Sequence, residues 1–214
     1  MTAVRWPGVA LIAAAVVTVV AEAIAASAWT IRPYSYADDY VNFLGAPFTG
    51  EFEGIVISSP LWFVMSAGWI VSGLLIAAAG LRLARRLWAP RRVRAVLVAV
   101  FSVLQAIGLI LFATVPLGPD TVAAGMLGVY LAGAFLSVIA GNALVIAIAA
   151  SRRALGMPGW AGITALVLGV AGLVSIPVTY GWAPIGIAER ISVYTFLAGA
   201  VVLGVGILVR GRRA

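Results

Sequence analysis

The sequence predicts an all-α membrane protein, a polytopic bundle of about six transmembrane helices with both termini in the cytoplasm. Of its 214 residues 64% are hydrophobic and only 10% are charged, which leaves too few polar side chains to coat a water-soluble domain. Six apolar runs also reach the ~20 residues that a helix needs to cross a bilayer. We therefore expect a multi-pass protein of the cell's inner (plasma) membrane.

The six runs follow one another with short connections and one long one. They lie near residues 8–29, 60–81, 95–115, 122–149, 159–181 and 191–209. The long connection, an outer loop at 30–58, contains no soluble domain, so residues 1–214 are treated as a single transmembrane domain. A cleaved signal peptide at 1–28 is an alternative, because Ala26-Ser27-Ala28 resembles a cleavage site, but the apolar stretch is long and contains Glu22.

The orientation follows from the arginines, which supply all the positive charge because the chain has no lysine and no histidine. Only Arg32 and Arg190 fall on one side of the runs; the others lie in the N-terminus, the 82–94 and 150–158 connections and the C-terminus. The positive-inside rule places these four segments in the cytoplasm. The net charge of +7 thus indicates topology, and we expect no nucleic-acid partner, because the arginines do not form one face interleaved with aromatics.

The acidic residues collect on the predicted outer side. Glu22 is the exception, because it is the only acid well inside a run. On a helix it forms a stripe with Thr18, Ala25 and Trp29 at i, i+4, i+7 and i+11, which should face the bundle because a bare carboxylate in lipid is costly. Two interpretations remain open: a structural ion pair, with Arg190 as the partner, or a functional acid.

A second polar group precedes the last run. Glu189 follows Pro184 and Gly186 and begins the helix, where the N-terminal partial charge favours an anion. Arg190 and Tyr194 share a face at i and i+4. We expect the outer ends of the first, fifth and sixth helices to converge with the 30–58 loop, so that these three side chains and Glu22 surround one site.

Other polar and aromatic residues follow helical spacing. One stripe on the second run is either core packing or a ligand wall, and comprises Ser59, Trp62, Ser66, Trp69 and Gly73. Gln105 and Asn142 lie deeper and are expected to bond other helices. The candidate catalytic residues are Glu22 and Glu189. The candidate substrate-binding residues are Arg190, Tyr194, Trp29, Tyr36, Trp62, Ser66 and Trp69.

Three motifs stand out on the predicted outer side: Tyr34-Ser35-Tyr36 followed by Tyr40-Val41-Asn42-Phe43-Leu44-Gly45, then Ser59-Pro60-Leu61, then Gly186-x-x-Glu189-Arg190-x-x-x-Tyr194. Together they resemble the bacterial domain of unknown function 998 family over nearly the whole chain. The resemblance implies a small multi-helix membrane protein and supplies no activity. The family's ISDLG-like motif departs here, with Asn42 and Phe43 in place of Ser and Asp, whereas Glu189 and Arg190 match its G-x-x-ER motif.

The composition narrows the possible chemistry. Without cysteine, histidine or lysine, the chain cannot offer thiolate, imidazole or Schiff-base chemistry, and no metal or organic cofactor is expected. Carboxylic acids, tyrosine and serine hydroxyls, arginine charge and apolar walls remain. Proton-initiated cyclisation of an isoprenoid needs only these groups, and in size, helix number and reliance on acids the chain is similar to small membrane-bound terpene cyclases, although no motif is shared.

Two alternatives to this cyclase remain. A proton-coupled carrier or exporter of a hydrophobic compound would use Glu22 to take and release a proton. A non-catalytic assembly partner would need only close helix packing, for which the small residues Gly68, Ser72 and Gly80 suffice. A closed aromatic pocket would favour the enzyme, a passage to both sides the carrier, and no cavity the assembly partner. The expected partner is a lipid- or isoprenoid-like molecule; oligomeric state is not predicted.

Overall fold

The computed structural model describes residues 2–52, 54–179 and 184–209, and six long helices dominate it. Their bounds are α1 Thr2–Ser27, α2 Trp62–Leu87, α3 Arg92–Thr114, α5 Leu127–Ala150, α6 Gly159–Thr179 and α7 Ile185–Val209. Each contains a segment that is long and apolar enough to cross a membrane. The predicted all-α bundle of six membrane-length helices is confirmed, while its orientation across the membrane stays a prediction.

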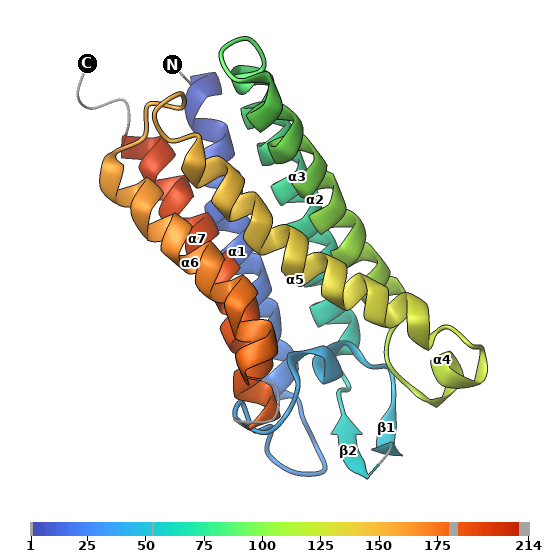
Figure 1. Ribbon diagram of the computed structural model, residues 1–214. Helices are drawn as coiled ribbons and strands as arrows, with labels where there is room; N and C mark the ends of the chain where they lie inside the picture. The colour runs from blue at the N-terminus through green and yellow to red at the C-terminus, as the bar shows by residue number, and fades with distance from the viewer. Residues whose placement is uncertain (1, 53, 180–183, 210–214) are drawn as a thin grey trace.

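The helices run along one long axis (Figure 1). Helix α1 packs against α2 and α7, α3 packs against α2 and α5, and α5 also contacts α7, so that these five helices form a ring. Helix α6 packs outside this ring against α5 and α7. The centre of the bundle is therefore lined by five helices from distant parts of the sequence.

The two ends of the bundle differ in structure. At one end, which we call the loop end, residues 28–61 contain a 3-10 helix, η1 (Val41–Gly45), and an antiparallel hairpin of β1 (Thr49–Phe52) and β2 (Ile55–Ser58), with α4 (Pro119–Ala123) beside them (Figure 1). At the other, the terminal end, α1 begins and α7 ends. Neither the hairpin nor α4 was predicted, because four- or five-residue elements carry too little periodicity to be recognised.

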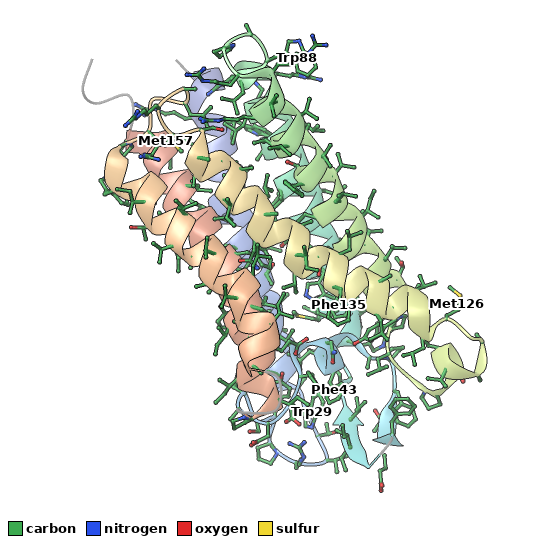
Figure 2. The ribbon with its side chains drawn as sticks, viewed as in Figure 1. Trp29, Phe43, Trp88, Met126, Phe135 and Met157 are labelled. Atoms are coloured by element: carbon green, nitrogen blue, oxygen red, sulfur yellow. The ribbon has the colours of Figure 1, made fainter. Side chains whose placement is uncertain are left out.

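The charges divide between these ends. The arginines of the connections after α2 and α5 lie at the terminal end, where the Arg92 guanidinium stacks 5.0 Å from the ring centroid of Trp88. Figure 2 shows Trp88 at this end and Trp29 and Phe43 at the loop end. Glu53 and the C-terminal arginines Arg210, Arg212 and Arg213 lie outside the described residues.

Four helix bounds differ from the prediction by five residues or more, and the first is the start of α1, at Thr2 instead of 8. Helix α2 continues to Leu87 instead of ending near 81, because arginine is a good helix former and charge alone does not end a helix. Helix α5 begins at Leu127 instead of 122, after a turn in which Gly125 has φ +70°. Helix α7 begins at Ile185, six residues before the predicted 191, so Glu189 lies inside the helix and does not begin it. Its expected role at the helix start is therefore wrong.

Small residues on α2 allow the close packing that was expected. A Cβ on Gly80 would lie 1.8 Å from the Ser102 hydroxyl oxygen of α3, so only glycine fits there. Ser72 lies 2.8 Å from the Thr18 hydroxyl of α1 and donates to the Ala14 carbonyl at 2.8 Å. This row holds α2 between α1 and α3.

Candidate functional site

A buried ion pair joins the first and last helices near the loop end. The Nε and Nη2 atoms of Arg190 donate to Oε1 of Glu22 at 3.0 and 2.9 Å, and the Tyr194 hydroxyl donates to Oε2 at 2.7 Å. Glu22 is 1% exposed and Arg190 is 7% exposed. Because Arg190 and Tyr194 are four residues apart on α7, they reach the same carboxylate from one helix face. The partner expected for Glu22 is thus the one found.

Arg190 also holds the 28–61 segment onto the bundle. Its Nη1 donates to the carbonyls of Tyr36 at 2.7 Å, Asp39 at 2.9 Å and Gly186 at 3.2 Å, and its Nη2 donates to the Tyr34 hydroxyl. The guanidinium carbon lies 4.9 Å from the Tyr36 ring centroid and 5.4 Å from that of Tyr34. Every guanidinium nitrogen has a protein partner, so Arg190 connects two helices to the loop and has no donor group left unpaired for a substrate.

The loop residues around Arg190 complete this arrangement. Burial raises the pKa of the Tyr34 phenol above its ordinary value, against the opposing effect of Arg190, so the neutral phenol accepts from Arg190 and donates to the Tyr40 carbonyl at 3.0 Å. Partial burial also raises the pKa of the Tyr36 phenol, although the residue as a whole is 48% exposed. Close contact with α7 depends on Gly186, because a Cβ there would lie 2.5 Å from the Asp39 carbonyl oxygen.

An ion pair inside the loop fixes its shape. The Arg32 guanidinium donates to both carboxylate oxygens of Asp39, and the Ser35 backbone N–H donates to Oδ2 of Asp39 at 2.7 Å. Hydrogen bonding of its guanidinium to Asp39 raises the pKa of Arg32 above its ordinary value. Asp39 is 1% exposed, so these partners take the place of the water that a surface carboxylate would bind. The loop is therefore held from within as well as by Arg190.

Glu189 has different surroundings from Glu22, although its neighbour in sequence is Arg190. Its Oε2 accepts a hydrogen bond of 2.5 Å from the Val41 backbone N–H in η1. Across the described parts of the chain, Glu189 forms no ion pair. The two candidate catalytic acids therefore have separate partners and do not form a carboxyl pair.

Glu189 lines a cavity of about 40 Å³ in the loop-end half of the bundle. The cavity lies in the ring of helices, and its walls include Thr18, Val41, Trp69, Phe112, Ser137 and Phe196. The rings of Trp69 and Phe112 are 4.5 Å apart, and Phe112 stacks on Tyr130 at 5.2 Å. The cavity thus combines an acid, two hydroxyl groups and an aromatic wall.

The other candidate substrate-binding residues lie away from this cavity. Trp29 is buried and packs 5.1 Å from the Tyr34 ring. Trp62 is partly buried beside Phe63. In the part of the chain that the structure describes, neither the Trp29 Nε1 nor the buried Ser66 hydroxyl has a hydrogen-bond partner. Of the five residues in the stripe predicted on the second span, Trp69 is the one in the wall of this cavity. The stripe is therefore mostly core packing.

The predictions for the two deeper amide side chains, Asn142 and Gln105, had different outcomes. Asn142 donates to the Ser192 carbonyl of α7 at 3.0 Å, as expected for a residue that bonds another helix. The expectation for Gln105 is wrong, because neither of its amide atoms has a hydrogen-bond partner among the described residues, although the residue is fully buried. Gln105 instead lines a second cavity, of about 10 Å³, and Phe196 lines both cavities.

Several cavity residues were not found from the sequence. Val41, Phe112 and Ser137 carry no signal of their own, because a valine, a phenylalanine and a serine on apolar helices or loops look like ordinary packing. Only the tertiary structure brings them to Glu189. The signal that did exist was Glu189 itself, an acid next to the last membrane run.

A comparison with protein families identifies the family of this chain. A family model described as a protein of unknown function, DUF998, matches residues 8–206. The chain belongs to the DUF998 family. No curated protein and no solved structure matches it. In this DUF998 protein the adjacent acid and arginine of the G-x-x-ER motif have different partners, since Arg190 binds Glu22 and the loop while Glu189 faces the cavity.

The departure from the family's loop motif also has a structural setting. Phe43, where the resemblance implies an aspartate, is 3% exposed and packs 5.1 Å from the Tyr40 ring. Asn42 follows Val41, whose N–H binds Glu189, and the buried side-chain oxygen of Asn42 has no hydrogen-bond partner within residues 2–52, 54–179 and 184–209. An apolar side chain therefore fills the aspartate position in this DUF998 protein.

Proposed function

We propose that this membrane protein is a proton-coupled carrier of a small hydrophobic compound, and that Glu189 is the carboxyl group that exchanges the proton. The contrast between the two acids carries the proposal. Glu22 is bonded to a guanidinium group, so its carboxylate already has a partner. Glu189 faces a cavity and has no ion-pair partner within the described residues. An intramembrane acid of this kind is a functional group by default.

The position of the cavities also supports a carrier. The cavity beside Glu189 and the smaller one beside Gln105 both have Phe196 in their walls. Both cavities lie inside the ring of helices. A carrier holds its substrate inside the bundle, because the substrate must be reached from each side in turn.

The terpene cyclase considered from the sequence has less support. Pockets that enclose a whole small-molecule ligand measure roughly 300–1,000 Å³, whereas the cavity beside Glu189 measures about 40 Å³. Glu22, one of the two candidate catalytic acids of such a cyclase, is bound to Arg190. An assembly partner would explain the close helix packing but not a cavity with an acid in it.

Proton movement in reconstituted vesicles tests the proposal. The purified protein would be placed in vesicles that contain a pH-sensitive dye and then exposed to a neutral isoprenol (farnesol), an anion (octanoate) and an amine (octylamine), with protein-free vesicles subtracted. We expect at least one compound to drive proton movement with the wild type and not with Glu189→Gln. Glu51→Gln, on the exposed hairpin, should behave as the wild type. Proton movement that is absent with every compound, or unchanged in Glu189→Gln, would overturn the proposal.

A further inference from the structure

We infer that the cavity beside Glu189 binds a primary ammonium group, so that the transported compound is an amphiphilic amine. This inference rests on the proposed function, because it names the substrate class of the same site. Three features of the cavity support it: its unpaired charge, its aromatic wall, and its size together with its hydrogen-bond acceptors.

The first feature is the charge. Glu189 is partly buried, and its carboxylate accepts one hydrogen bond, from the Val41 backbone N–H. A partly desolvated carboxylate is stabilised by a partner cation, because desolvation of an unpaired ion is expensive. Arg190, its sequence neighbour, directs its nitrogens to Glu22 and to loop carbonyls. A cation that enters the cavity would supply the missing partner of Glu189, whereas a neutral ligand would leave the carboxylate unpaired.

The second feature is the aromatic wall. Trp69, Phe112 and Phe196 line the cavity, and the faces of aromatic rings attract cations, with tryptophan the strongest. The wall is held rigidly, because Trp69 is 4% exposed and Phe112 is 6% exposed, and their rings are in contact. A carboxylate beside aromatic faces is complementary to an organic cation and not to an anion.

The third feature distinguishes a primary ammonium group from bulkier cations. A water molecule needs a cavity of roughly 10–15 Å³. The cavity beside Glu189, at about 40 Å³, therefore has room for roughly three water-sized groups, such as the nitrogen and last carbons of an alkylamine. A primary ammonium group has three N–H donors. The Glu189 carboxylate can accept one, and Thr18 and Ser137, which each have a hydroxyl oxygen, line the same cavity. Ser137 donates its own proton to the Ala134 carbonyl at 2.8 Å, so its oxygen can act as an acceptor.

Binding of octylamine and 1-octanol to the purified protein tests the inference. The two compounds share a chain and differ in the charged head group. We expect octylamine to bind the wild type and raise its unfolding temperature, and 1-octanol to bind at least about tenfold more weakly, since hydrogen bonds to charged groups are worth more than a tenfold change in affinity. Glu189→Gln should lose a similar factor, Trp69→Leu less, and Glu51→Gln nothing.

Two results would overturn the inference: equal binding of octylamine and 1-octanol, or undiminished octylamine binding by Glu189→Gln. The first comparison uses only the wild type, so it holds even where a variant fails to fold. Failure of the inference and failure of the proposed function are separable. Octylamine binding without proton movement would overturn the carrier alone, whereas proton movement driven by farnesol, with no octylamine binding, would overturn the amine alone.

Discussion

Arg190 donates from two nitrogens, Nε and Nη2, to a single oxygen of Glu22, and so leaves the other carboxylate oxygen to Tyr194. Both members of the pair are buried. Removing one partner from such a pair destabilises the fold much more than replacing both partners by apolar residues, because the remaining charge stays desolvated. The pair is therefore a mechanical link between α1, α7 and the loop.

Glu22→Gln should accordingly destabilise the protein. We expect a loss of roughly 3–5 kcal/mol, the usual cost of breaking a buried pair, and a lower unfolding temperature followed by intrinsic tryptophan fluorescence. Glu51→Gln removes an equal charge from the exposed hairpin and should leave unfolding unchanged. A Glu22→Gln protein as stable as the wild type would show that the pair does not hold the fold.

The two membrane acids should differ in chemical reactivity. Dicyclohexylcarbodiimide modifies carboxyl groups in apolar surroundings while they carry a proton. As the group proposed to exchange the proton, Glu189 carries one for part of each cycle, so we expect the reagent to modify Glu189 and to spare Glu22, which is bound to a guanidinium group. Mass spectrometry of peptides would locate the adduct. In Glu189→Gln the modification should disappear. An adduct on Glu22 would reverse the roles given to the two acids.

Asp39 and Asp38 offer a matched pair inside the loop. Asp39 is buried and accepts from Arg32 and from the Ser35 N–H, whereas Asp38 is exposed. Asp39→Asn should cost about 1–3 kcal/mol, as expected for hydrogen bonds to a charged group, and should speed cleavage of the loop tyrosines by chymotrypsin. Asp38→Asn should be cleaved at the wild-type rate. Equal rates in the two variants would mean that Asp39 does not order the loop.

Close contact of the loop with α7 predicts a glycine requirement. A Cβ on Gly186 would lie 2.5 Å from the Asp39 carbonyl oxygen and 2.7 Å from that of Ala37, and neither backbone atom can move freely. Gly186→Ala should lower the unfolding temperature, whereas Gly128→Ala on α5, where nothing lies within 4 Å of the new Cβ, should not lower it. Similar unfolding temperatures for both variants would argue against the packing described.

The membrane orientation can be tested with single cysteines, because the chain has none of its own. Glu51 and Arg153 are both exposed, and they lie at the loop end and the terminal end, respectively. Glu51→Cys should react with an impermeant maleimide added outside intact cells, and Arg153→Cys should react only after the membrane is opened. The reverse pattern would invert the predicted topology, and reaction of both from one side would contradict the six spans.

The sequence predicted the long-range skeleton of this protein better than its loop end. Apolar runs of membrane length define helices locally, and an isolated acid such as Glu22 demands a partner, of which only Arg32 and Arg190 lay on the same predicted side. Those two constraints were enough for the six helices and the ion pair. Charged residues at helix ends were misleading, however, because Glu189 and the arginines after residue 81 continue their helices.

The cavity could not be predicted for a different reason. Its walls come from α1, η1, α2, α3, α5 and α7, and a space between helices depends on how residues such as Phe112 and Phe196 pack. No periodicity in any one segment records that packing. The same holds for Gln105, whose amide was expected to find another helix and instead borders empty space.

The link between Glu22 and Arg190 also sets an order for biogenesis, because 168 residues separate the two partners along the chain. The ribosome delivers α1 first and α7 last, so the Glu22 carboxylate enters the bilayer long before its guanidinium partner has been synthesised. Chains that stop before α7 therefore carry an unpaired acid and an unanchored loop.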